Sequence, residues 1–295
     1  MTSTAANENQ RPNSSQRWRE RRSRFVGATE YIRPDEYHVE VLDGDKLARQ
    51  FIEQHHYARS LPATRLNCGL YRNAPTGSRL VGVACFSVPM NNQAITRHTG
   101  LEFARQGCDL GRLVLLDEVP SNGESWFLSR AMKLLQTAKP EIEAVIAYSD
   151  PVVRRTAGGN TILPGHVGEI YQALGAICRG RGTRRTLRLL PDATVISDRT
   201  LSKIRNGETG QEYGMRQIID QGAEAPKAGE HPAQWIERLD RTGFFQRIAH
   251  PGNWVYSFPL SNKAKELGRP IDAYHYPKRD RTVINGDVSR LPLAA

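Results

Sequence analysis

The stretch Ala144-Val-Ile-Ala-Tyr-Ser-Asp150 is a short apolar run that ends in a carboxylate and is followed by Pro151. Its length and apolar residues predict a buried β-strand, and the proline takes the chain out of the sheet directly after it. In open α/β sheets, ligands bind beyond the carboxyl ends of the strands. We therefore expect Asp150 at an active site, where it accepts a proton or holds a metal or a substrate amine. A turn cap before Pro151 is the structural alternative.

Hydrophobic periodicity on either side of this strand predicts an α/β or α+β fold, in which helices flank a central sheet. The strands are expected at 38–42, 65–72, 80–88, 111–116, 144–148, 187–190 and 254–258, and the helices at 46–56, 122–139 and 169–174. Asp45 is the expected cap of the first helix, and Ser121 and Glu124 have the spacing of a capping box at the start of the second. The polar stretch 89–108 has no clear period.

Composition shifts along the chain predict five segments, because a polar stretch without periodicity cannot bury a core. The expected segments are a basic, disordered arm at 1–35, a catalytic core at 36–191, a polar helical insert at 192–245, a C-terminal strand region that completes the core at 246–280, and a flexible tail at 281–295. No internal repeat is visible.

Arginine tracts carry much of the formal net charge of +10. The tract 17–24 holds five arginines around one tryptophan, and a second run between 179 and 188 has no acidic residue. Arginine suits bidentate contact with phosphate and stacking on bases. The charge therefore favours a polyanionic partner such as double-stranded DNA, with a merely basic surface as the open alternative. The expected DNA contacts are Arg154, Arg155, Arg179, Arg181, Arg184 and Arg185.

The four cysteines of the 295-residue chain stand far apart, without the spacing of a zinc site. Buried free thiols in a reducing compartment are expected. No apolar run approaches the roughly 20 residues that span a bilayer, and the Arg-rich N-terminus lacks the apolar region of a signal peptide. We expect a cytoplasmic protein without a membrane partner. The oligomeric state stays open, with a homodimer among the alternatives.

Several further residues are candidates for chemistry, each with a structural alternative. His56 and Tyr57 lie at a predicted helix end, where a histidine often neutralises terminal carbonyls. Tyr171 would project from a short helix, or simply pack there. Arg112 lies in a predicted buried strand, where a guanidinium must be paired or face a polar cavity. The turn at 121–125 opens a helix, so its amides could hold phosphate or only be capped.

Five segments, taken in order, resemble the Mom family of phage DNA-modification proteins, which are related to GNAT-type acyltransferases. These segments are His56-Tyr57, Leu110–Leu113, Asp117–Ser125 with Leu128-Ser129, Ala147–Asp150 and Gly165–Ala173. The resemblance covers about residues 38 to 190 and implies a GNAT-like central mixed sheet. It also implies transfer of a carbamoylmethyl group to N6 of adenine in duplex DNA, which protects phage DNA from restriction in the host cytoplasm.

The resemblance further implies which residues act. Roles in activity fall on His56, Tyr57, Arg112, Ser125, Asp150 and Tyr171, and an iron ion is implied at His56, Asp150 and Tyr171. For the reaction itself, Asp150 is the expected proton acceptor or metal ligand, because the adenine amine must lose a proton as the N–C bond forms. Tyr57 and Tyr148 are expected to stack on the base or hydrogen-bond to it, with Arg112 or Ser125 on the donor side.

The cofactor-binding turn is expected at Ser121, Asn122 and Gly123. GNAT enzymes hold the pyrophosphate of acyl-CoA at such a turn, but a single glycine beside Glu124 makes a poor diphosphate cradle, which argues against acyl-CoA as the donor. Two other functions stay open. One is a GNAT-like N-acetyltransferase of a protein or small amine, and the other is a non-catalytic phage DNA-binding protein.

Overall fold

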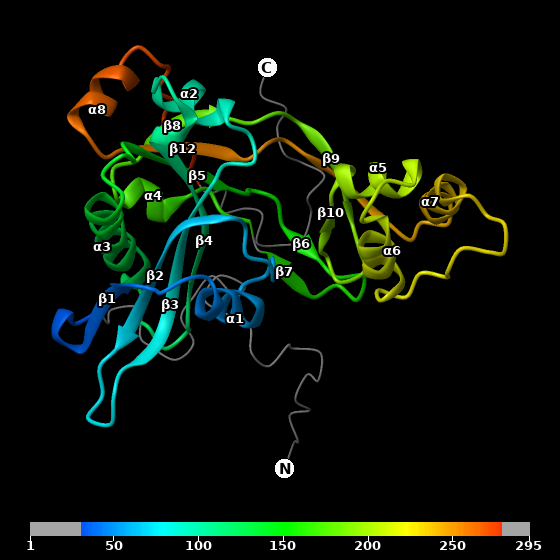
Figure 1. The fold of residues 1–295 in the computed structure, drawn as a ribbon, viewed down its shortest axis with the longest axis horizontal. Helices are drawn as coiled ribbons and strands as arrows, with labels where there is room; N and C mark the ends of the chain where they lie inside the picture. Colours follow the sequence, from blue (N-terminus) through cyan, green and yellow to red (C-terminus); the bar gives the residue numbers. More distant parts are fainter. Residues whose placement is uncertain (1–30, 164, 279–295) are drawn as a thin grey trace.

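The computed structural model describes residues 31–163 and 165–278 of the chain. The expected tail and the arm up to residue 30, including its arginine tract, lie outside the described residues. A seven-stranded sheet forms the body of the protein, in the order β1-β2-β3-β4-β5-β12-β8 (Figure 1). Its strands are β1 (Tyr37–Val41), β2 (Thr64–Arg72), β3 (Arg79–Ser87), β4 (Gly107–Leu115), β5 (Ala144–Ser149), β8 (Ile177–Arg181) and β12 (Trp254–Pro259).

The sheet is mixed, because β4 and β5 are parallel and its other neighbouring strands are antiparallel. β4 and β5 pair over only three residues each, Gly107–Asp109 against Ala144–Ile146. Beyond Asp109, β4 continues along β3, while β5 runs on beside β12 to Ser149. Asp150 therefore leaves the sheet just past the point where β4 and β5 separate.

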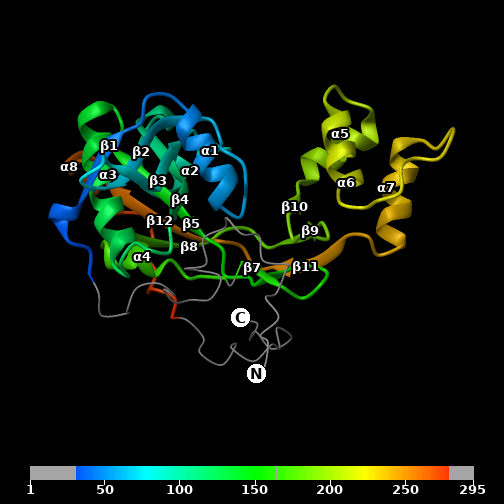
Figure 2. The same cartoon turned by 90° about the horizontal axis from the view of Figure 1, so that it is seen from below.

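Helices cover both faces of this sheet, which confirms the predicted fold class (Figures 1 and 2). α3 and α4 pack on one face in the largest apolar cluster, with β2, β5 and β12. On the other face, α1 packs against β3 and β4, and α2 and α8 pack against β5. The helices are α1 (Lys46–His55), α2 (Gln93–Thr99), α3 (Gly123–Ala138), α4 (Glu169–Ala173) and α8 (Asn262–Gly268), with short 3-10 helices at Pro34–Glu36 and Ala104–Gln106.

The predicted helical insert contains α5 (Asp198–Asn206), α6 (Gln211–Ile219) and α7 (Pro232–Arg241), which project from the body (Figure 2). These helices share a separate apolar cluster around the fully buried Trp235. A three-stranded sheet connects them to the body, in the order β10 (Val195–Ile196), β9 (Arg185–Leu189) and β11 (Gln246–His250). The strand predicted at 187–190 thus belongs to this small sheet. A hairpin of β6 (Arg154–Arg155) and β7 (Thr161–Leu163) lies between β5 and α4.

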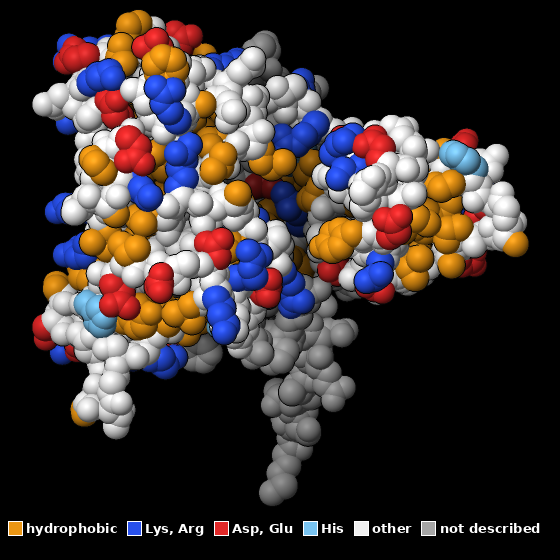
Figure 3. Space-filling view, in the orientation of Figure 1, with side chains coloured by type: hydrophobic (Ala, Val, Ile, Leu, Met, Phe, Trp, Pro, Cys, Tyr) orange, Lys and Arg blue, Asp and Glu red, His pale blue; other side chains and the backbone are white. Residues whose placement is uncertain are grey.

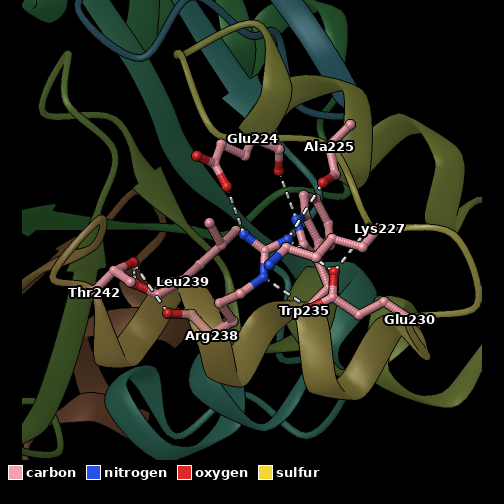
Figure 4. A network of polar contacts seen from close by, with 8 residues as sticks. All are labelled: Glu224, Ala225, Lys227, Glu230, Trp235, Arg238, Leu239 and Thr242. Atoms are coloured by element: carbon pink, nitrogen blue, oxygen red, sulfur yellow. Dashed lines mark hydrogen bonds and ion pairs between the residues drawn. The ribbon is translucent and has the colours of Figure 1, made fainter.

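Arg238 fixes the loop between α6 and α7 (Figure 4). Its guanidinium forms two bonds of 2.8 Å with the carboxylate of Glu230 and one of 3.0 Å with Glu224. The indole of Trp235 donates to the carbonyl of Glu224 at 2.8 Å, so the same loop is held to the buried ring. The loop is therefore ordered by local contacts of the insert.

Three local predictions need correction. α2 lies in the stretch that showed no period; it has only seven residues and ends at Gly100 in the left-handed conformation. α3 begins after Asn122 and not after Ser121, and the side chain of Asn122 accepts the backbone N–H of Ile32 at 2.7 Å instead of capping the helix. The Asp45 carboxylate likewise caps no amide of α1, because it accepts hydrogen bonds from Thr64 and Asn67.

Two predictions from composition can be compared with the described residues. The four cysteines are buried free thiols, as expected. In the described part of the chain, none of the helices has the length and apolar character needed to cross a membrane.

Candidate active site

Asp150 is held by three donors at the end of β5. Its carboxylate is buried, with 7% of the residue exposed. Oδ1 accepts the backbone N–H of Val152 and the Nε2 of His250, both at 2.9 Å, and Oδ2 pairs with the guanidinium of Arg154. Burial alone would raise the pKa of this carboxyl, but the His250 hydrogen bond and the Arg154 charge outweigh it and lower the pKa. Asp150 is therefore ionised and fully engaged, which suits an anchor better than a proton acceptor.

His250 is absent from the candidates that the sequence predicts, although it binds Asp150 directly. It ends β11, 100 residues further along the chain, and its side chain is fully buried. Nδ1 accepts the backbone N–H of Gly252 at 3.1 Å, so the proton of the neutral ring lies on Nε2 and is donated to Asp150. The turn is tight, because a Cβ on Gly252 would lie 2.0 Å from the carbonyl oxygen of Gly182. The only local indication was the turn His250-Pro-Gly252 before a predicted strand.

His56 and Arg112 lie on neighbouring elements and bind the same loop. His56 caps α1, and its Nδ1 accepts the backbone N–H of Ala58 at 3.0 Å. Arg112, on β4, donates to the carbonyl oxygen of Ser60 at 2.8 Å and to its hydroxyl at 3.2 Å. Burial, with the Arg112 charge, lowers the pKa of His56 to about 3. His56 is therefore neutral, and Arg112 is paired as a guanidinium in a sheet must be.

Tyr57 connects these two parts of the site. Its ring lies 4.3 Å from the ring of His56, between centroids, at an interplanar angle of 30°. Burial raises the pKa of Tyr57, and the charges of Arg154, Asp150 and Arg112 all act on it. We name this group the Asp150 cluster, and its members are Asp150, Arg154, His250, Tyr57, His56 and Arg112.

Tyr171 lies beside the Asp150 cluster, in the core. It packs against Tyr256 and Phe258, and its hydroxyl is 3.5 Å from the carbonyl oxygen of Tyr148. Burial raises its pKa, and the neighbouring Tyr57 raises it further. The structure thus brings together five of the six residues predicted to act in catalysis, all but Ser125.

The predicted cofactor turn makes its contacts within the protein. Ser125 donates to the carbonyl oxygen of Asn122 at 3.1 Å, the amide of Gly123 donates to Pro120 at 2.9 Å, and Asn122 binds Ile32 as described above. A Cβ on Gly123 would lie 2.5 Å from Val119, so this glycine serves close packing. The Gly123 amide and the Asn122 side chain are therefore both engaged within the protein.

The three residues implied for iron do not fit a metal ion as they are arranged. His56 uses Nδ1 as an acceptor, which leaves the proton on Nε2 and no free lone pair. Both oxygens of Asp150 are engaged, and the Arg154 cation lies against them. The raised pKa of Tyr171 disfavours a phenolate. Among the described residues, no group of three or more His, Cys, Asp or Glu side chains is placed to hold a metal.

The arginines predicted to contact DNA divide into two kinds. Arg154 faces Asp150, and Arg179 is buried, with 7% of the residue exposed. Arg179 donates to Ser257 and to the backbone carbonyls of Gly268, Ile271 and Asp272. It therefore anchors the chain after β12, and its prediction as a DNA contact needs correction.

Four of the six arginines predicted to contact DNA are exposed. Arg181 lies over the Trp254 ring, Arg155 donates to Thr161, and Arg184 and Arg185 follow each other in the chain. The surface is hollowed between body and insert, with basic side chains on both sides (Figure 3).

Replacing Arg179 by leucine is expected to lower the free energy of unfolding by about 2–3 kcal/mol, because buried carbonyls lose their charged donor. Denaturant unfolding followed by circular dichroism measures this. The same replacement at the exposed Arg184 should change the free energy by less than about 0.5 kcal/mol. Equal effects at both positions would show that the Arg179 contacts do not stabilise the fold.

A groove of about 430 Å³ lies elsewhere, between β1 and α3. Trp126, Arg130 and Lys133 line it, together with residues of β1, and the Arg130 guanidinium lies 3.7 Å from the centre of the Trp126 ring. None of the residues of the Asp150 cluster lines this groove, so the two are separate features.

The sequence profile of the Mom protein family matches residues 36–232, more than half of the chain. The chain belongs to the Mom protein family. Among curated proteins, the methylcarbamoylase Mom of Escherichia phage Mu is 30% identical over 128 residues, which are 43% of this chain and 47% of that relative. The chain thus spans about half the length of the curated relative it matches. In this Mom family member, Asp150, Arg154, Tyr57, His56 and Arg112 lie inside the family match, whereas His250 lies beyond its end.

Proposed function

We propose that this chain modifies DNA by transferring a carbamoylmethyl group, or a related acyl-derived group, to N6 of adenine. Membership of the Mom family supports this, as does the similarity to a phage protein named a methylcarbamoylase. The observation that carries the proposal is the Asp150 cluster. Side chains from β4, β6, β11 and the residues directly after α1 gather there around one buried, ionised carboxylate.

The chemistry of the substrate fits this arrangement. The exocyclic amine of adenine is a weak nucleophile, and an enzyme reaches it by extracting the base from the stack at a cost of a few kcal/mol. The half-buried ring of Tyr57 offers a surface on which the extracted base can stack. Asp150 acts by fixing Arg154 and His250. The exposed arginines contribute phosphate contacts that offset the cost of extraction.

The sheet supports a GNAT-like relation for the core. Its single parallel pair, β4 and β5, separates after three residues, and the site lies beyond that separation. In the turn before α3, in contrast, the Gly123 amide and the Asn122 side chain form hydrogen bonds within the protein. This supports a group donor other than acyl-CoA.

Replacing Arg184 and Arg185 together by glutamine is expected to weaken duplex binding at low salt. Each lost phosphate contact should reduce the slope of log K against log salt by about 0.9, because fewer counterions are released. Fluorescence anisotropy with a labelled duplex over a salt series measures this slope. A control with Lys265 and Arg269, exposed cations at α8, replaced by glutamine removes the same charge and should leave the slope nearly unchanged. Equal slopes for both variants would argue against a contact at Arg184 and Arg185.

The proposed function is tested by weighing nucleosides. The chain is expressed in cells that carry a plasmid, and the recovered plasmid is digested to nucleosides and analysed by mass spectrometry. A deoxyadenosine heavier by one carbamoylmethyl group is expected. Unchanged nucleosides, with the folded chain bound to DNA, would instead indicate a binding protein. Saturable acetyl-CoA binding and acetylation without DNA would indicate an acetyltransferase.

A further inference from the structure

Asp109 occupies the point at which the two parallel strands separate. It is the last residue of β4 that pairs with β5, opposite Ile146, and on its other side it lies opposite Ser87 of β3. From there β5 runs four residues further to Asp150. Asp109 therefore lies between β3 and β5, at the base of the separation that leads to the Asp150 cluster.

One oxygen of this carboxyl has no donor. Oδ1 of Asp109 is fully buried and has no hydrogen-bond partner among the described residues, and the same holds for Oγ of the neighbouring Ser87. Buried polar atoms in folded proteins are almost always paired, because an unpaired one costs free energy. The side chain as a whole is half-buried. A buried, unpaired Oδ1 costs the fold free energy, which favours a role for this carboxyl other than stabilising the fold.

Ionisable groups on three elements act electrostatically on Asp109 or are affected by its charge. Arg112 follows it on β4, Tyr148 lies on β5, and Tyr171 lies on α4; each interacts with it electrostatically. Burial raises the pKa of Asp109 to about 7, and the Arg112 charge only partly opposes this. The pKa of Asp150 is shifted in the opposite direction, and such a divergence between two carboxyls is typical of sites that separate acid–base work from charge stabilisation.

We propose that Asp109 is the catalytic base that takes the proton from the substrate amine. This rests on the proposed function. The lone pair of adenine N6 forms the N–C bond to an electrophilic carbon of the donor, which is an activated acyl-derived compound with a leaving group. The bonding pair to the leaving group departs with that group, and the amine proton passes to the carboxylate of Asp109.

The other ionisable groups of the site are poorer acceptors. Asp150 has both oxygens engaged, and its lowered pKa makes it a weak base. His56 is neutral, with its pKa near 3. Tyr57 and Tyr171 have raised pKa values and stay protonated. Asp109 is left as the acceptor whose proton affinity matches a neutral medium.

The test compares wild type with Asp109→Asn and with the exposed control Asp43→Asn. Purified chain and plasmid DNA are incubated with a small-molecule extract of host cells as the donor source, from pH 5.5 to pH 8.5, and adducts are weighed. Wild type and the control should gain activity as the pH rises through about 7, because the base must be ionised. Asp109→Asn should lose on the order of 10²- to 10⁴-fold and show no such rise.

Thermal unfolding of the same variants tests the titration of Asp109 and needs no group donor. The folded pKa of Asp109 lies above its unfolded value, so the carboxyl should destabilise wild type progressively between pH 4 and about 7. The Tm of Asp109→Asn should therefore rise relative to wild type over that range and stay level above it. A lower Tm for the variant, or a Tm difference independent of pH, would overturn the proposal.

The outcomes distinguish this proposal from the proposed function. Adducts in wild type together with an unchanged rate in Asp109→Asn would overturn the role of Asp109 alone. The absence of adducts in wild type would contradict the proposed function itself.

Discussion

Alanine in place of His250 is expected to lower the free energy of unfolding by about 4 kcal/mol, because it leaves a buried carboxylate without one of its three donors. His250 is fully buried and donates Nε2–H to Asp150, while its Nδ1 holds the Gly252 amide. Both bonds are lost together. The first joins the end of β11 to the end of β5, and the second holds the turn after β11. Urea unfolding at neutral pH measures the change.

Two controls separate the hydrogen bond from the loss of a ring. His275→Ala removes an exposed imidazole and should change the free energy of unfolding by less than about 0.5 kcal/mol. His250→Gln keeps an N–H donor of similar reach and should recover part of the loss. If the alanine and glutamine variants were equally destabilised, the bond to Asp150 would not be the cause.

Replacement of Asp150 by asparagine is expected to reduce DNA modification by on the order of 10²-fold or more, with the chain still folded. Asparagine keeps the shape of the side chain and can still accept the Val152 amide, but it removes the charge that holds Arg154. A displacement of about 1 Å in a site costs on the order of 10²-fold in rate. Duplex affinity should be unchanged or slightly higher, because a negative charge is lost.

The Asp43→Asn variant is the matched control for this change, because it removes an exposed aspartate. It should keep wild-type modification and wild-type binding. Loss of duplex binding in Asp150→Asn would contradict the interpretation, since it would place Asp150 in the DNA contact and not in the reaction.

The sequence was most informative where structure is decided by neighbouring residues. The apolar run before Asp150 predicted β5 and the carboxylate at its end, and the apolar stretch at 254–258 predicted β12. The position of β12, between β5 and β8, depends on tertiary packing and carries no local pattern. α2 was missed because a seven-residue helix shows too little periodicity.

The candidate site was predicted in part for the same reason. Asp150, Arg112 and Tyr57 could be named from local motifs, whereas His250 reaches Asp150 only because β11 pairs with β9 after the long insert. Arg179 looks like its exposed neighbours in sequence, and only the burial of β8 distinguishes it. Asp109 lies between the stretch without a period at 89–108 and the strand predicted at 111–116, so its place beside β5 could not be inferred.

The most direct test of the central claim weighs deoxyadenosine from plasmid recovered from cells that express wild type, Asp150→Asn or Asp43→Asn at equal levels. We expect the added mass with wild type and with Asp43→Asn, and its loss with Asp150→Asn. The same adduct level with Asp150→Asn as with wild type would contradict the claim that the Asp150 cluster carries the reaction.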